Sequence, residues 1–156
     1  MAKKLTSTNN DVIDISLSSI RKKRFRIDGD DSRILELDTS DLSILSRIRE
    51  AYPKLQELND KAVSDWAHRD NEDYDATVDI LTNIDSEMRK LIDYIFDTNA
   101  SELCAPTGTM YDPIGGQFRF EHIITTLSAL YETNINSEVK QLSERVQKYT
   151  NKYTGK

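Results

Sequence analysis

Two amphipathic segments on either side of a loop rich in proline and glycine constrain the fold of this chain more than any other feature. Apolar residues recur every three or four positions through residues 78–96 and again through 120–130, which is the period of an α-helix with one buried face. Two helices cannot bury both stripes alone, so a third element must pack against them. We therefore expect helices at about residues 74–97 and 118–134, joined by a loop at 100–116.

A further helix is expected at about residues 41–68, where apolar residues again follow helical spacing. The preceding residues Asp38 and Asp41 suit a helix N-cap and the positive end of the helix dipole. Pro53 lies inside the pattern and lacks a backbone donor, which predicts a kink or break near residues 51–52.

The C-terminal segment, residues 137–152, has a narrower apolar row, spaced by three and four: Val139, Leu142, Val146, Tyr149 and Tyr153. The segment is either a separate short helix or a continuation of the helix that begins near residue 118. Because its apolar row is narrow, we expect it to pack on another molecule, with Tyr149 and Tyr153 as contact residues.

Residues 23–38 have the pattern of a β-hairpin. Short runs alternate polar and apolar residues on either side of the turn residues Asp28, Gly29 and Asp30. The acidic cluster lacks the ligand spacing and the closing glutamate of an EF-hand loop, so we interpret it as turn chemistry. A third short strand is predicted at residues 13–17, where alternating apolar residues would have one face buried.

Charge divides the chain into a basic arm and an acidic body. Residues 1–26 carry seven Lys or Arg and two Asp, and the remainder carries 14 basic and 25 acidic residues. An acidic body argues against binding nucleic acid, because the neutralisation of phosphates needs a basic surface. The basic arm is either a solubilising tail or a segment that contacts an acidic partner or another copy of the chain.

The sequence predicts neither catalytic residues nor a cofactor or metal site, and we therefore expect no enzymatic activity. Cys104 and His122 flank the same loop, but Cys104 lies in what looks like a short buried turn, where a free cysteine usually serves packing. His68 stands beside several acidic residues without the spacing of a metal site. The single cysteine fits a reducing cytoplasm.

The loop at 100–116 is the most interesting surface, because long loops in compact domains are often functional. Its apolar side chains either cover the helix pair as a lid or contact a partner. With the basic run and the C-terminal tyrosines, they complete a set of candidate partner-binding residues: Arg21, Lys22, Lys23, Arg24, Leu103, Met110, Tyr111, Ile114, Tyr149 and Tyr153.

The predicted fold class is α+β: an N-terminal hairpin, or three short strands, packed on a bundle of three to four helices. Residues 1–22 would form the arm and residues 23–156 a single domain. Two strings carry a resemblance: the hairpin and helix entry, Arg-Phe-Arg-Ile-Asp-Gly-Asp-Asp followed by Ile-Leu-Glu-Leu-Asp-Thr-Ser-Asp-Leu, and Leu91-Ile-Asp-Tyr-Ile-Phe-Asp leading to Phe118-Arg-Phe-Glu-His-Ile-Ile.

In these strings and in its element order, the chain over residues 23–135 resembles small tail-assembly chaperones of long-tailed, siphovirus-type bacteriophages. The resemblance implies a non-enzymatic role, in which the protein keeps the aggregation-prone tape-measure protein soluble while tail-tube subunits polymerise around it. The basic arm and the C-terminal helix lie outside the resemblance.

The expected function is therefore that of a phage tail-assembly chaperone or morphogenesis protein. One alternative is a structural virion subunit of the tail or connector, and another is a phage-encoded inhibitor of a host defence enzyme that uses acidic mimicry. Expected partners are tape-measure or tail-tube proteins, or copies of the chain in a homo-oligomer. No run is long enough to span a bilayer and the first residues lack a secretory signal, so we expect the host cytoplasm during assembly, or the virion.

Overall fold

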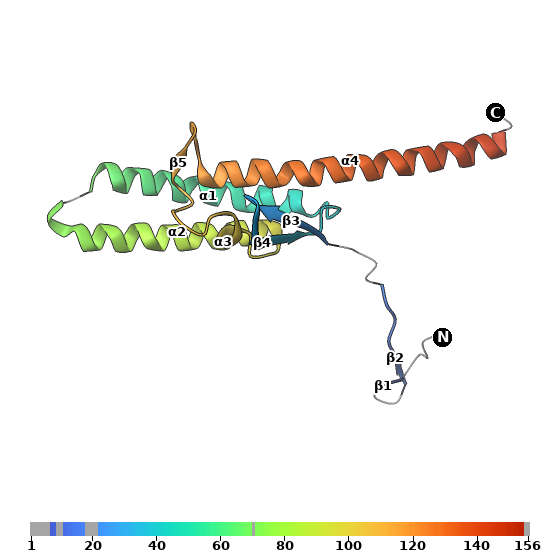
Figure 1. Ribbon diagram of the computed structural model, residues 1–156, viewed down its shortest axis with the longest axis horizontal. Coiled ribbons are helices and arrows are strands. Elements are labelled where there is room, and N and C mark those ends of the chain that lie inside the picture. Colours follow the sequence, from blue (N-terminus) through green and yellow to red (C-terminus); the bar gives the residue numbers. More distant parts are fainter. Residues whose placement is uncertain (1–6, 9–10, 18–21, 70, 155–156) are drawn as a thin grey trace.

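The computed structural model describes residues 7–8, 11–17, 22–69 and 71–154. Within these residues the fold is α+β, with short antiparallel strands followed by four α-helices. Figure 1 shows an elongated molecule in which the C-terminal half of the last helix extends beyond the other elements. The predicted fold class is confirmed.

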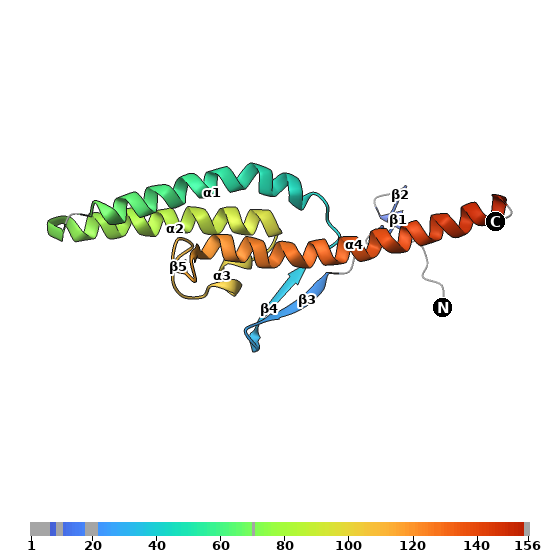
Figure 2. The same ribbon diagram turned by 90° about the horizontal axis from the view of Figure 1, so that it is seen from above.

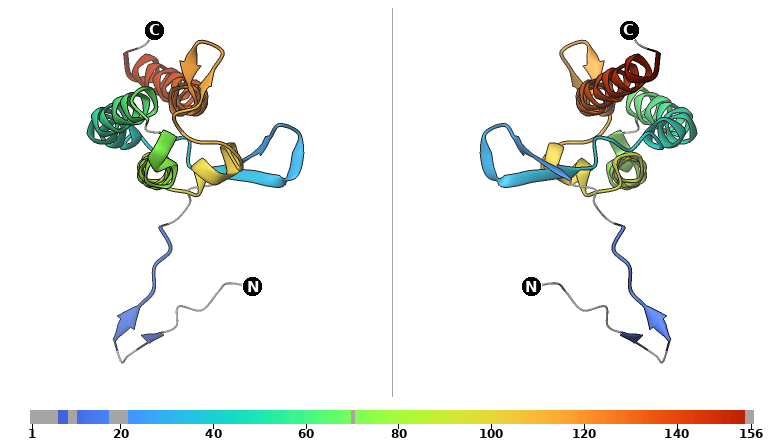
Figure 3. Two further views of the ribbon diagram at one scale, coloured as in Figure 1. Left: turned by 90° about the vertical axis from the view of Figure 1, so that its left-hand side faces the viewer. Right: turned by 90° about the vertical axis from the view of Figure 1, so that its right-hand side faces the viewer.

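Three helices form the body. Helix α1 (Ile44–Ala67) and helix α2 (Tyr74–Phe96) lie side by side and antiparallel, and the first half of α4 (Arg119–Thr154) packs along them. Viewed end on, the three helices form a triangular bundle (Figure 3). The largest fully buried side chains include Leu55, Ile92 and Phe120, one from each helix. The two apolar stripes thus pack on each other and on a third element, as predicted.

The β-hairpin lies against the bundle and consists of β3 (Lys23–Ile27) and β4 (Asp30–Leu37). Asp28 and Gly29 have positive φ angles of 53° and 70°, which the turn requires. Leu35 and Leu37 point into the core and are fully buried. The predicted hairpin is confirmed.

The turn acids make local contacts. Asp30 Oδ1 accepts hydrogen bonds from the amide (2.9 Å) and hydroxyl (2.7 Å) of Ser32. Asp28 pairs with Arg33 at 3.2 Å. These contacts support the interpretation of the cluster as turn chemistry.

Helix α1 begins at Ile44, three residues later than predicted. Asp38 and Asp41 do not cap it, because each accepts hydrogen bonds from the amide and hydroxyl of the serine two residues on, Ser40 and Ser43 respectively. Both acids therefore form turns ahead of the helix, and the capping prediction is wrong.

Helix α1 passes through Pro53 without interruption, so the predicted break is wrong. Figure 2 shows a gently curved helix. Pro53 and Arg49, whose carbonyl would have accepted the missing hydrogen bond, are both exposed. Water can therefore hydrogen-bond to this carbonyl, and a smooth bend accommodates the ring.

Helix α4 is continuous, so separate helices at 118–134 and 137–152 are wrong and the alternative of a single helix is confirmed. Neither proline nor glycine interrupts residues 119–154. Side chains on one face are buried as far as Tyr131, whereas every described side chain from Asn136 onwards is exposed. We call residues 135–154 the α4 overhang.

The loop at 100–116 contains two elements that the sequence analysis missed. Helix α3 (Ala100–Cys104) covers one turn, and β5 (Pro113–Ile114) pairs with β6 (Gln117–Phe118). The turn between the two strands is made by Gly115 and Gly116, with φ angles of 61° and 82°. The glycine pair thus turns the chain between the two strands.

In the N-terminal arm, β1 (Ser7–Thr8) pairs with β2 (Val12–Ile13). The prediction of one buried face at residues 13–17 is wrong, since all described side chains of residues 11–17 are exposed. An alternating pattern of apolar and polar residues is compatible with a buried face, but burial also requires another element to pack against that face. Of the basic run, Arg21 lies outside the described residues, Lys22 and Arg24 are exposed, and Lys23 donates to Asn134 on α4 (2.5 Å).

We expect deletion of residues 1–22 to leave the body folded, because no described side chain of the arm is buried. The melting temperature of the truncated chain should lie within a few degrees of that of the full chain. Circular dichroism measures this directly, and a collapsed helical signal in the truncated chain would contradict the expectation.

Candidate functional site

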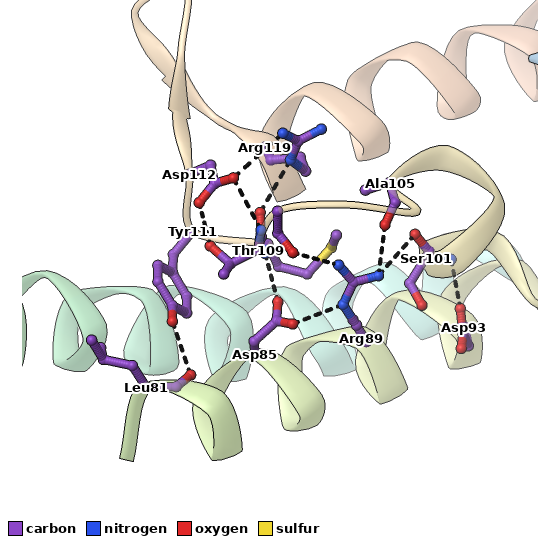
Figure 4. A network of polar contacts seen from close by, with 12 residues as sticks. Leu81, Asp85, Arg89, Asp93, Ser101, Ala105, Thr109, Tyr111, Asp112 and Arg119 are labelled. Carbon is purple, nitrogen blue, oxygen red and sulfur yellow. Dashed lines mark hydrogen bonds and ion pairs between the residues drawn. The ribbon is translucent and has the colours of Figure 1, made fainter. Parts of the chain in front are cut away.

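A network of polar contacts fastens residues 98–112 to the bundle (Figure 4). At its centre is Arg89 on α2. Its Nη1 donates to the carbonyl oxygens of Ser101 (3.2 Å) and Ala105 (2.9 Å), and its Nη2 donates to that of Gly108 (2.9 Å). Its Nε pairs with Asp85 at 2.8 Å, one helical turn away. One guanidinium thus satisfies three loop carbonyls.

Two acids of α2 bind loop amides. Asp85 Oδ1 accepts a hydrogen bond from the amide of Met110 (2.7 Å), and Asp93 Oδ1 accepts one from the amide of Ser101 (2.7 Å). A carboxylate that accepts from a backbone amide makes a charge-assisted hydrogen bond, which is stronger than a neutral one. The same face of α2 therefore binds both carbonyls and amides of the loop.

Arg119, the first residue of α4, fixes the far end of the loop. Its Nε donates to the carbonyl of Thr109 (3.1 Å), while Asp112 accepts from the amide (3.0 Å) and hydroxyl (2.5 Å) of Thr109. Gly108 is required here, because its φ is 81° and an added Cβ would lie 2.4 Å from Asp112 Oδ2.

A third arginine acts from the hairpin. Arg33 on β4 donates to the carbonyl oxygens of Leu103 (2.8 Å) and Cys104 (3.2 Å). Arg33, Arg89 and Arg119 thus come from three separate elements and bind the backbone of one loop. The arrangement supplies hydrogen-bond donors to six backbone carbonyls of a segment with little regular structure.

The loop is therefore a lid on the helix pair. Met110 is fully buried in the core, so its prediction as a partner contact is wrong. Leu103 and Tyr111 are half-buried against the core, and the Tyr111 hydroxyl donates to the carbonyl of Leu81 (2.9 Å). Of the four predicted loop residues, Ile114 is the most accessible, with 44 % of its surface exposed.

The Asp112 carboxyl should make the free energy of unfolding depend on pH. Burial raises its pKa, but hydrogen bonds from the Thr109 hydroxyl and amide and from Arg119 outweigh burial, so the pKa lies below its ordinary value of 3.8. A depressed pKa contributes stability above the unfolded value, and this stability is lost as the pH falls through the folded value. We expect the free energy of unfolding to fall below about pH 4, and to fall less steeply in Thr109→Val. Urea titrations at several pH values test this, and equal slopes would contradict it.

Cys104 and His122 form no catalytic pair in this structure. Burial raises the pKa of the Cys104 thiol to about 11, which keeps it protonated at neutral pH. The His122 ring contacts the side-chain amide of Gln117 at 2.9 Å, and no hydrogen bond among the described residues joins it to Cys104.

We therefore expect Cys104 to react slowly with a disulfide reagent such as DTNB at about pH 8, since the thiolate is the reactive form. In urea the same thiol should react at the rate of a free cysteine. The absorbance of the released thiolate measures both rates. Rapid labelling of the folded chain would show that burial does not protect the thiol.

An apolar groove lies between the C-terminal end of α1 and the β5–β6 hairpin. Its volume is about 420 Å³, and Val63 and Trp66 on α1 face Tyr111, Pro113 and Phe118 across it. Trp66 is 58 % exposed and Val63 43 % exposed. We call this the Trp66 groove. Val63 and Trp66 follow the helical spacing of residues 41–68, which gives no sign of the groove; the one signal in the sequence is the apolar residues that flank the Gly115–Gly116 turn.

A second exposed apolar surface is the row on the α4 overhang. Val139 and Leu142 are each 53 % exposed and Val146 is 62 % exposed. Tyr149 and Tyr153 belong to the same helix, but their side chains lie outside the described part of the structure. Their predicted partner contact remains a prediction.

Among the residues that the structure describes, no group of three histidine, cysteine or acidic side chains could hold a metal ion. The described helices include none that is long and apolar enough to cross a bilayer. Comparison of the chain with protein-family models, curated proteins and solved structures gave no match.

Proposed function

We propose that this chain is a phage tail-assembly chaperone or related morphogenesis protein, which acts by binding another protein and performs no chemistry. The single observation that carries the proposal is the Trp66 groove. Exposed contiguous apolar surface is costly to keep in water, and it often marks a site for another protein.

The groove has the features of a helix-binding site. Tryptophan is enriched among the residues that dominate binding energy, because it buries a large rigid surface. An amphipathic helix that lays its apolar face between Val63 and Pro113 would cover Trp66 and the wall around Phe118. The tape-measure protein, as a long helical client, would present such faces repeatedly.

The fastening of one wall of the groove supports the same role. One wall is the β5–β6 hairpin, which follows directly on the loop that Arg89 and Arg119 fasten to the bundle. A preformed wall avoids the entropy cost of ordering a loop upon binding. The acidic charge outside the basic arm would keep a complex with an apolar client dispersed.

Co-expression with the tape-measure protein of the same phage tests the proposal. Wild-type chain should keep the tape-measure protein in the supernatant after centrifugation, and Trp66→Glu should leave most of it in the pellet. Tyr74→Glu is the matched control, because Tyr74 is 67 % exposed at the start of α2 and does not line the groove. If Trp66→Glu keeps the client as soluble as the control does, the groove does not bind it.

A structural virion subunit is the second candidate, and the α4 overhang favours it, since a projecting helix suits a permanent contact between subunits. Mass spectrometry of purified virions distinguishes the two functions. A chaperone should be absent from the particles, whereas a structural subunit should be present at a fixed ratio to the tube protein.

A further inference from the structure

The α4 overhang has the residue spacing of a coiled-coil helix. From Ile135 onwards apolar positions alternate by four and three residues: 135, 139, 142, 146, 149 and 153. This is the seven-residue repeat in which Val139 and Val146 occupy the a positions, and Ile135 and Leu142 the d positions. Apolar residues repeated at a and d are the sequence pattern of helices that pair along a coiled-coil seam.

From Val139 onwards the described apolar side chains of the overhang are not covered by any other described element. The seam residues Val139, Leu142 and Val146 are each more than half exposed. About 20 residues of helix, roughly 30 Å long, project from the body at 1.5 Å per residue (Figure 1). Serine, threonine and asparagine are frequent here and are weak helix formers, so a helix of this composition is marginal alone in water. A second helix along the seam would stabilise it.

The charges beside the seam indicate which helix pairs with the overhang and in which direction that helix runs. The g positions 138 and 145 carry opposite charges, Glu138 and Arg145, whereas the e positions 136, 143 and 150 are uncharged. Neither Glu138 nor Arg145 forms an ion pair with a described side chain. In a parallel pair g faces e, and both charges would face neutral residues.

We infer that two copies of this chain pair through the α4 overhang as an antiparallel coiled coil. In that arrangement g faces g, so Glu138 of each copy lies beside Arg145 of the other, and two equivalent ion pairs form. The same register places Val139 against Leu142, and Ile135 against Val146, of the second copy. The seam is self-complementary, as a two-fold interface requires. The inference is independent of the Trp66 groove and of its client.

Sedimentation of the full chain over a wide range of concentrations tests the pairing. We expect a dimer for the wild type and a monomer for Leu142→Asp. Gln141→Asp places the same carboxylate one position along the helix, away from the seam, and should remain a dimer. Thermal melting of each variant should show an intact body, because Leu142 lies outside the bundle.

Charge reversal tests the direction. Glu138→Arg and Arg145→Glu should each weaken the dimer about tenfold, because each replaces two attractive pairs with two repulsive ones. The double variant Glu138→Arg with Arg145→Glu restores opposite charges and should recover an affinity near that of the wild type. A monomeric wild type, a dimeric Leu142→Asp, or single reversals without effect would each overturn the inference.

Discussion

Replacing Ile92 with aspartate is expected to lower the free energy of unfolding by about 3–5 kcal/mol, the largest loss expected of any substitution proposed for this chain. Ile92 is fully buried in the last two turns of α2, within the triangular bundle. An isolated charge in such a site costs several kcal/mol, and about 3–5 kcal/mol is typical for an uncompensated buried charge. A domain of this size is stable by only about 5–15 kcal/mol, so the loss removes much of the margin.

Thermal melting and urea unfolding measure the effect of Ile92→Asp. Ser86→Asp is the control, because Ser86 lies on the same helix with an exposed side chain and receives the same charge. The control should melt close to the wild type. If both variants have the melting temperature of the wild type, Ile92 does not belong to the core.

Replacing Arg89 with methionine has the second large expected effect, a loss of about 3 kcal/mol in the free energy of unfolding. The change removes an ion pair and three hydrogen bonds from a charged donor, each worth roughly 1.5–3 kcal/mol before the remaining groups find water. Methionine keeps much of the aliphatic stem, so the loss reflects the polar contacts more than packing.

The loss should be concentrated in the loop. Hydrogen exchange of the amides of residues 100–112 should accelerate more than that of α2 itself, since Arg89 is the central anchor of this segment. Lys90→Met is the control: Lys90 is the next residue, is exposed and makes none of these contacts. An equal effect in both variants would show that the carbonyl contacts of Arg89 contribute little.

Local patterns were sufficient for the elements that repeat a simple period. Helix α2 and the hairpin at residues 23–38 lie where their spacing predicts, because a periodic stripe and a turn with positive φ have few alternative structures. The predicted start of α1 was wrong for a local reason: the serines after Asp38 and Asp41 compete with the helix for the carboxylate oxygens.

Other features could not be predicted because they depend on surfaces distant in sequence. The exposed arm strand at Ile13 shows that alternation does not by itself create a core. Helix α3 has five residues, which is too short to show a period. The role of Arg89 was unpredictable because its partners are backbone carbonyls, which any residue provides, so no pattern of side chains marks them.

For the candidate site, the sequence identified the loop at 100–116 as a surface of interest but could not distinguish a lid from a contact. Met110 is buried, as a lid residue would be, whereas Ile114, four residues later, is exposed, as a contact residue would be. Trp66 is the last residue of a helical stripe, a pattern typical of a buried face, yet its side chain is 58 % exposed. Whether a residue at the end of a helix is exposed depends on the lengths of the neighbouring helices. The apolar pattern of one helix contains no information about those lengths.

The three arginines that hold the loop set the order in which its structure can be completed during synthesis. Arg33 and Arg89 emerge from the ribosome before the loop, but Arg119 follows it and belongs to the last helix. The wall opposite Trp66 therefore cannot take its final position until that helix has been made and has docked. Under the proposed function, a nascent chain would therefore be unable to engage its client before α4 has been made.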